Sequence, residues 1–172
     1  KWLDYSALEH QAVREQVGLL DISTFSKFLL QGRDAEKIIN HVSANNMSVP
    51  PGRIVYTQWL NEQGGISADL TVTRLAEDVY MVMTAFSSHT RDFNWLRSHI
   101  PPDTHAVLTD VTAAYAGINV QGPNARALLQ KVSSADFSNQ AFPFGMSREI
   151  ELGYATVRAS RISYVGELGW EL

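Results

Sequence analysis

The strongest constraint on the fold is an internal repeat. Residues 30–42 read L-Q-G-R-D-A-E-K-I-I-N-H-V and residues 120–132 read V-Q-G-P-N-A-R-A-L-L-Q-K-V, an offset of 120 − 30 = 90 positions. Each copy has the pattern of a strand, a tight glycine turn and an amphipathic helix, which any such unit could share by chance. We interpret the repeat as a duplication near residues 25–100 and 115–172. It predicts an α+β fold of two related units, each with a helix on an antiparallel sheet.

Hydrophobic periodicity and turn residues predict the other elements. We expect helices over 6–17, 35–42, 124–132 and from Ser87 or Ser88 to about His99. We expect strands over 25–30, 54–60, 66–75, 79–83, 115–120, 147–152 and 154–163. Gly18 is expected to end the first helix, and the Asp34 carboxylate to cap the second.

The composition argues against several classes of partner. The formal net charge is −4 and the 14 Lys and Arg residues are scattered singly, whereas nucleic-acid binding needs basic clusters. Cysteine is absent and the five histidines show no close ligand spacing, so we expect neither disulfides nor a metal site. No apolar run approaches the ~18 residues of a membrane span, so we expect no membrane partner.

The predicted hairpin over 54–75 carries an acid where strands disfavour one. Asp69 lies between apolar neighbours, and burying an unpaired carboxylate is costly. A four-residue loop at 62–65 would place Gln58 opposite Asp69 and Tyr56 diagonally from it on the same face. A five-residue loop would place them on opposite faces. Two interpretations stay open: a solvated Asp69 at an edge, or an acid that faces a cavity together with Tyr56.

The segment 161–172, R-I-S-Y-V-G-E-L-G-W-E-L, ends the chain. Two glycines predict a bend between strands, and Tyr164 and Trp170 offer flat apolar faces near Glu171. A carboxylate framed by rings suits a planar ligand edge with two adjacent N–H donors, such as a guanine or pterin edge. The alternative is a hairpin in which Glu171 is solvated and the rings belong to the core.

These stretches resemble a known family over nearly the whole chain. The segment 161–172 closely resembles one in the tetrahydrofolate-binding domain of dimethylglycine and sarcosine dehydrogenases. It is similar, more loosely, to the Tyr-x-Gly-Glu-x-Gly-[Phe/Trp]-Glu motif of the glycine-cleavage T-protein, an aminomethyltransferase. Further matches follow in order: A-V-R-x-x-V-G-L-L-D-I-S from residue 12, Q-G from 31, N-x-x-G-G-I-x-x-D-L from 61, R-D-x-x-W-L from 91 and Q-G-P from 121.

The resemblance implies roles for five residues. Asp69 matches the acid near the reacting folate nitrogens, and is therefore both the catalytic candidate and a folate contact. Glu171 matches the glutamate that holds the pterin edge. Tyr56 and Tyr164 match rings that line the folate site. Thr84 stands where T-proteins usually carry Asn, so its contact would come from a hydroxyl in place of an amide.

Two departures favour the dehydrogenase branch of the family. T-proteins often carry a pair of aspartates where this chain has Ala68 and Asp69. They also tend to follow Asp-Val-Ser with His-Met, whereas here Asp21-Ile-Ser is followed by Thr24 and Phe25.

The resemblance therefore implies that residues 1–172 are the N-terminal portion of an aminomethyltransferase-like folate-binding domain in a longer, flavin-dependent dimethylglycine or sarcosine dehydrogenase. Such a module passes the one-carbon unit of an oxidised N-methylglycine to tetrahydrofolate, and a carboxylate can take up the proton and stabilise the cationic iminium. We expect FAD only in a domain outside this chain, since no G-x-G-x-x-G fingerprint occurs.

The expected partners are small molecules, a folate and an N-methylated glycine derivative. The expected location is a bacterial cytoplasm or a mitochondrial matrix. We expect the chain alone to be inactive, with a half-built site. The alternatives are a glycine-cleavage aminomethyltransferase and a non-catalytic folate-binding or regulatory module.

Overall fold

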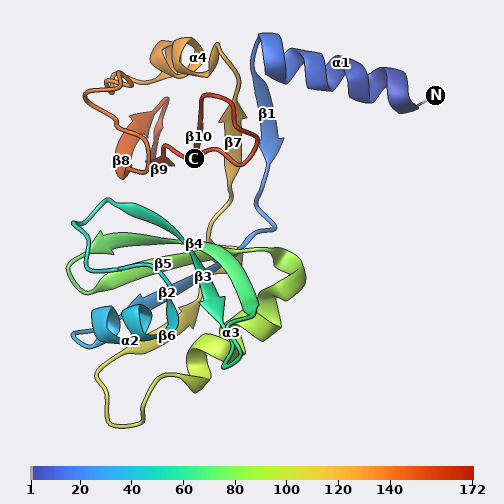
Figure 1. Cartoon of the computed structure of the whole chain (residues 1–172). Helices are drawn as coiled ribbons and strands as arrows, with labels where there is room; N and C mark the ends of the chain where they lie inside the picture. The colour runs from blue at the N-terminus through green and yellow to red at the C-terminus, as the bar shows by residue number, and fades with distance from the viewer. Residues whose placement is uncertain (1) are drawn as a thin grey trace. The chain divides into compact units, whose positions relative to one another are not determined.

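The structure, a computed structural model, describes residues 2–172 as two compact units (Figure 1). The middle unit spans Ser23–Ala116, and the terminal unit combines residues 2–22 with Gly117–Leu172. Each unit has its own cluster of buried apolar residues. Among the described residues, no helix is long and apolar enough to cross a membrane.

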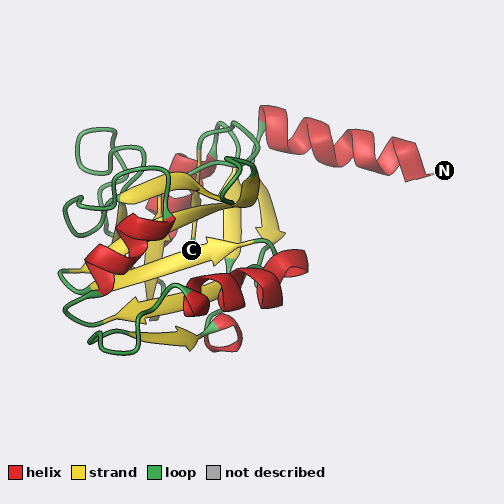
Figure 2. Cartoon of the chain, turned by 60° about the horizontal axis from the view of Figure 1, so that its bottom comes forward, coloured by secondary structure: helices red, strands yellow, loops and turns green. Residues whose placement is uncertain are grey.

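The middle unit is a five-stranded antiparallel sheet in the order β3-β4-β5-β2-β6. Its strands are β2 (Ser26–Gln31), β3 (Ile54–Leu60), β4 (Ile66–Ala76), β5 (Val79–Thr84) and β6 (Val107–Asp110). Helices α2 (Ala35–Val42) and α3 (His89–Ser98) cover one face, as Figure 2 shows. Val72 of β4 shares a core with Ile39 and Leu96 of these helices. Because apolar residues alternate along β4, only one face of the sheet is buried in this core.

The terminal unit has a second five-stranded antiparallel sheet, in the order β8-β9-β10-β7-β1. Its strands are β1 (Gly18–Asp21), β7 (Ile118–Gln121), β8 (Ser147–Leu152), β9 (Ala155–Ser160) and β10 (Gly169–Glu171). Helix α4 (Ala125–Val132) contributes Leu129 to a core that includes Trp170. Helix α1 (Trp2–Glu15) has no buried residue.

The two units repeat one arrangement at the 90-residue offset. Strand β2, Gly32 and α2 in the middle unit correspond to β7, Gly122 and α4 in the terminal unit. The two glycines have φ values of 129° and 134°. In each turn the glycine carbonyl accepts the N–H of the first helical residue, Ala35 at 2.8 Å and Ala125 at 3.0 Å. The predicted α+β fold, with a helix on an antiparallel sheet in each unit, is confirmed.

The correspondence extends to the strands on either side. Strand β5 pairs Tyr80 with Leu30, and β10 pairs Trp170 with Val120, again 90 positions apart. On the other side of the central strand, β6 borders β2 and β1 borders β7. Strands β6 and β1 therefore occupy equivalent positions in the two sheets. In sequence, however, β6 follows α2, whereas β1 precedes α4.

Glycine is required at the turn after β2. A Cβ on Gly32 would overlap the carbonyl oxygen of His105, and φ lies in a region that other residues rarely adopt. We expect Gly32→Ala to lower the free energy of unfolding by about 1–3 kcal/mol from backbone strain alone, with the overlap adding to this. Gly64→Ala is the matched control, because Gly64 has φ of 77° and a Cβ added there would meet nothing within 4 Å.

Urea unfolding followed by circular dichroism would measure both variants. Equal losses for Gly32→Ala and Gly64→Ala would show that the close approach to His105 contributes nothing. The expected result is a clearly larger loss at Gly32.

Several predicted boundaries were wrong. The first helix is Trp2–Glu15 instead of 6–17, and Gly18 begins β1 instead of ending that helix. Strands β1 and β6 were not predicted. Asp34 makes no side-chain capping bond; its Oδ2 accepts the N–H of His105 at 2.6 Å, because the close packing at Gly32 brings that loop against the helix start.

Candidate functional site

Asp69 lies on the face of the middle sheet opposite the helices. It is exposed, whereas its neighbours Ala68 and Leu70 are buried in the core. Gln58 pairs directly with Asp69, as a four-residue loop predicted, and its Nε2 donates to Asp69 Oδ1 at 3.3 Å. A register shift next to Leu60 absorbs an extra residue near the turn, so the pairing there differs from the prediction.

Tyr56 shares this face with Asp69. It pairs with Thr71, two residues along the strand from Asp69, and 57% of its surface is exposed. The prediction that both side chains lie on one face of the hairpin is therefore confirmed. Next to them, Thr71 pairs with the half-buried Met83 of β5, so the face combines an acid, a phenol ring and a thioether.

Asp69 does not line the cavity that the structure shows between α2 and α3. A cavity of about 570 Å³ in the middle unit is lined by the ends of α2 and α3 and by the β3–β4 turn, and neither Asp69 nor Tyr56 lines it. Asp69 instead lies on an open sheet face. Because water reaches it there, its carboxylate gains catalytic strength only if a ligand or further protein covers the face.

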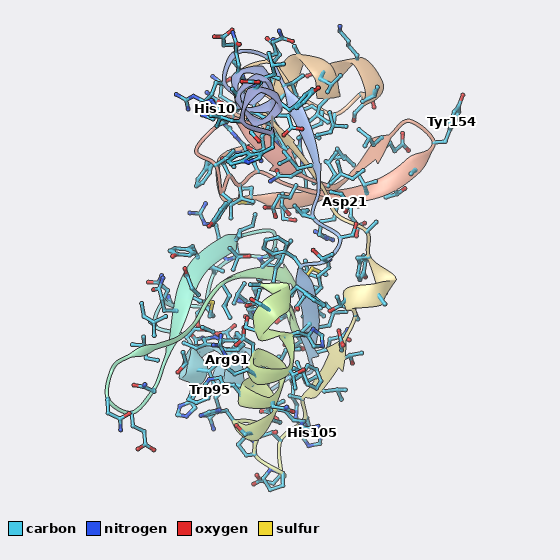
Figure 3. All side chains as sticks on the ribbon, turned by 90° about the vertical axis from the view of Figure 1, so that its right-hand side faces the viewer. His10, Asp21, Arg91, Trp95, His105 and Tyr154 are labelled. Carbon is cyan, nitrogen blue, oxygen red and sulfur yellow. The ribbon has the colours of Figure 1, made fainter. Side chains whose placement is uncertain are left out.

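Thr84 ends β5 and is buried. Its Oγ1 donates to Asp92 Oδ2 at 2.7 Å, and Ser88 Oγ donates to the same oxygen at 2.6 Å. Arg91 Nε donates to the other oxygen of Asp92 at 2.9 Å (Figure 3 labels Arg91 on α3). The hydroxyl proton of Thr84 is thus committed to a buried carboxylate, and a folate could meet only an acceptor lone pair. The role of Thr84 stays a prediction.

Glu171 lies in a row of polar residues across the terminal sheet. It pairs with Asn119 of β7 on one side and Ser160 of β9 on the other, and Ser160 pairs with Ser147 of β8. Asn119 and Ser147 are buried, and Glu171 and Ser160 are half-buried. Ser160 Oγ donates to Ser147 Oγ at 3.0 Å. Half-burial among polar neighbours suits a carboxylate that accepts hydrogen bonds from a ligand.

Trp170 does not frame Glu171. It is fully buried in the core of the terminal unit, with its ring 5.2 Å from that of Phe137 at a near-perpendicular angle. Because successive strand residues point to opposite faces, Trp170 and Glu171 cannot share one. The idea of a carboxylate between two rings was therefore wrong for Trp170. Tyr164 is 94% exposed in the loop before β10, so its ring is accessible to a ligand.

Gly169 leaves room for a buried glutamine. A Cβ on Gly169 would overlap the side chain of Gln121, its partner across the β7–β10 pair. Gln121 Nε2 donates to Asn119 Oδ1, while Gln121 Oε1 is buried without a partner among the described residues. Sequence reasoning did not find Asn119. The signal was available, because Asn119 is a polar residue between apolar ones in a predicted central strand.

The described residues contain no group of three His, Asp or Glu side chains that could hold a metal ion. The predicted site residues offer carboxylates and aromatic rings. Asp69 can take up or stabilise a positive charge, Glu171 can accept N–H donors, and Tyr56 and Tyr164 can contact a flat ring. Within the terminal unit, Glu171 and Tyr164 suit a heteroaromatic ligand with N–H donors, and a pterin has such an edge.

Comparison with protein families gives one match over the whole chain. The GCVT N-terminal domain model matches residues 1–172. Among solved structures, the chain is similar to the glycine cleavage system aminomethyltransferase T from Bartonella henselae. The TM-score is 0.81 at 26% identity, covering 95% of this chain and 43% of that one.

Two curated relatives are longer proteins. The chain is 37% identical to the 4-methylaminobutanoate oxidase (formaldehyde-forming) of Paenarthrobacter nicotinovorans, over 99% of the chain and 21% of the relative. It is 39% identical to the mitochondrial sarcosine dehydrogenase of Homo sapiens, over 94% of the chain and 19% of the relative. The chain thus spans about a fifth of the length of these relatives.

Proposed function

The chain belongs to the GCVT N-terminal domain family, and from that premise we propose that it is the tetrahydrofolate-binding module of a flavin-dependent dehydrogenase that demethylates an N-methylated glycine derivative. The observation that carries the proposal is the open sheet face of the middle unit. There Asp69, held by Gln58, and Tyr56 lie together on accessible surface.

Each site residue has a part in this proposal. In the terminal unit, Glu171 accepts the N–H donors of a pterin edge and Tyr164 contacts a flat ring. In the middle unit, Tyr56 contacts a flat part of a folate. Asp69 faces the reacting centre, where it stabilises the positive charge of the incoming iminium and takes up a proton. Gln58 restricts the orientation of the Asp69 carboxylate through its 3.3 Å hydrogen bond. Thr84 contacts folate through an acceptor lone pair of its hydroxyl, whose proton is donated to the buried Asp92.

Bound tetrahydrofolate supplies two nucleophilic nitrogens that together take over the one-carbon unit. For the exchange to balance, the two N–H protons lost from these nitrogens must end on the amine that leaves. We assign to Asp69 the relay of a proton between them. FAD, which accepts the electrons of the preceding oxidation, would belong to a part of the protein outside this chain.

A second candidate function is that of a glycine-cleavage aminomethyltransferase, which the fold similarity to aminomethyltransferase T favours. Against it stands Ala68, where T-proteins often have a second aspartate. The related sarcosine dehydrogenase is mitochondrial, so a mitochondrial matrix is the proposed location in a eukaryote and the cytoplasm in a bacterium.

Calorimetry with tetrahydrofolate tests the proposal on the whole protein that contains this chain. We expect saturable binding of one folate per chain. Absence of saturable tetrahydrofolate binding would refute the proposed function in either branch.

A further inference from the structure

The cavity between α2 and α3 lies apart from the proposed folate contacts. We define the α2–α3 cavity by His41 of α2, Trp95 of α3, His99 at the end of α3 and Glu62 of the β3–β4 turn. Its volume is about 570 Å³, which is ample for a small organic molecule. All of its lining residues belong to the middle unit, so the cavity is complete within one compact body.

Aromatic rings form one wall of the α2–α3 cavity. The Trp95 and His99 ring centroids are 4.5 Å apart at an interplanar angle of 42°, and the His41 ring is 6.2 Å from that of His99. Figure 3 labels Trp95 on α3. All three rings line the cavity, and the indole ring is the best of the common side chains at attracting a cation.

The tautomer of His99 keeps this wall electron-rich. His99 Nδ1 lies 2.8 Å from the carbonyl oxygen of Trp95, and a carbonyl can only accept a hydrogen bond. The ring proton of a neutral His99 is therefore on Nδ1, and Nε2 keeps its lone pair. A neutral imidazole held in this way presents an acceptor, and not a donor, at its other nitrogen.

Charge at the α2–α3 cavity favours a cation. Glu62 supplies a carboxylate at the rim, and no Lys or Arg is among the lining residues. Both helices end here: α2 ends at Val42 and α3 at Ser98. The aligned peptide dipoles of a helix give its C-terminus a partial negative charge, which adds to the field of Glu62. Protonation of His41 or His99 would add positive charge to the cavity and weaken the binding of a cation.

We propose that the α2–α3 cavity binds a small organic ammonium ion between the Trp95–His99 ring wall and the Glu62 carboxylate. An alkylammonium group matches each feature: its charge faces the carboxylate and the helix ends, and its alkyl carbons contact the rings. The proposal does not depend on folate binding. If the cavity bound no ammonium ion, the proposed folate function would be unaffected. If the protein bound no folate, the proposed ammonium site would likewise be unaffected.

Nuclear magnetic resonance of the tryptophan indole N–H groups tests the proposal on the 172-residue chain. The chain has four tryptophans, and the indole signal that disappears in Trp95→Phe is that of Trp95. Tetramethylammonium chloride should shift this signal saturably, whereas Trp59 and Trp170, buried in the two cores, should not respond. Sodium chloride controls for ionic strength, and tert-butanol is the neutral probe of similar size.

The charge requirement is tested by a pair of variants. Glu62→Gln should weaken tetramethylammonium binding about fivefold, since an exposed carboxylate–cation contact is worth up to about that factor. Glu77→Gln, which changes an exposed acid in the β4–β5 turn outside the cavity, should leave the affinity unchanged. The proposal is overturned by an unresponsive Trp95 signal, by equal responses to tert-butanol, or by equal affinity in Glu62→Gln and the unmodified chain.

Discussion

Asp69→Ala in the whole protein is expected to slow one-carbon transfer to tetrahydrofolate by about 10²–10⁴-fold, the usual contribution of a positioned acid–base group. The loss arises because the strand partners around Asp69 on this sheet face, Gln58, Tyr56 and Thr71, carry no second carboxylate that could replace it. Oxidation of the amine, a reaction assigned to a different part of the protein, should keep its rate. A stopped-flow assay that follows flavin reduction and folate product separately would measure both.

Two further variants make the Asp69 result interpretable. Asp69→Asn keeps the shape and the hydrogen bond from Gln58 while removing the charge, so it should lose nearly as much transfer activity as Asp69→Ala. Asp103→Ala removes an exposed acid from a loop of the same unit and should have no effect. An unchanged transfer rate in Asp69→Asn would show that Asp69 is not the catalytic residue.

Glu171→Ala is expected to weaken tetrahydrofolate binding more than about a hundredfold. The reason is that a carboxylate holding two adjacent N–H donors makes two charge-assisted hydrogen bonds of about 1.5–3 kcal/mol each, and ~1.4 kcal/mol is a factor of ten. Glu171→Gln keeps one acceptor oxygen and should lose about tenfold or more. Titration calorimetry on the whole protein would measure both affinities.

The matched control for Glu171 is Glu151→Gln, which changes an exposed acid on β8 of the same sheet. It should bind tetrahydrofolate like the unmodified protein. An unchanged folate affinity in Glu171→Ala would show that Glu171 does not contact the folate. Its role would then be to stabilise the sheet.

The local signals in the sequence were sufficient for the repeat, whereas the predicted strand register also needed a bulge that the sequence analysis did not find. Gly32 and Gly122 occupy turns that need positive φ. Such turns can be recognised in a sequence by their glycine, because few other residues adopt this conformation. The pairing of Gln58 with Asp69 was predicted from a four-residue loop, but five residues connect Leu60 with Ile66, and the register shift next to Leu60 restores the predicted pairing.

The errors came from contacts between residues distant in sequence. Alternation shows that Trp170 and Glu171 point to opposite faces, but not which face the core occupies. The burial of Thr84 against Asp92 depends on how α3 folds back on β5, which no local pattern specifies. Strands β1 and β6 have four residues each, too few for a period to be recognised.

The fate of one carbon atom distinguishes transfer to folate from release into water. Sarcosine or dimethylglycine labelled with carbon-13 in its N-methyl group would be turned over once by the whole protein with saturating tetrahydrofolate, and the products followed by nuclear magnetic resonance. We expect most of the label to appear in 5,10-methylenetetrahydrofolate with the unmodified protein. With Asp69→Ala, we expect most of it to appear in formaldehyde. Label released as free formaldehyde by the unmodified protein, as the name of the formaldehyde-forming relative describes for that enzyme, would contradict the proposed transfer.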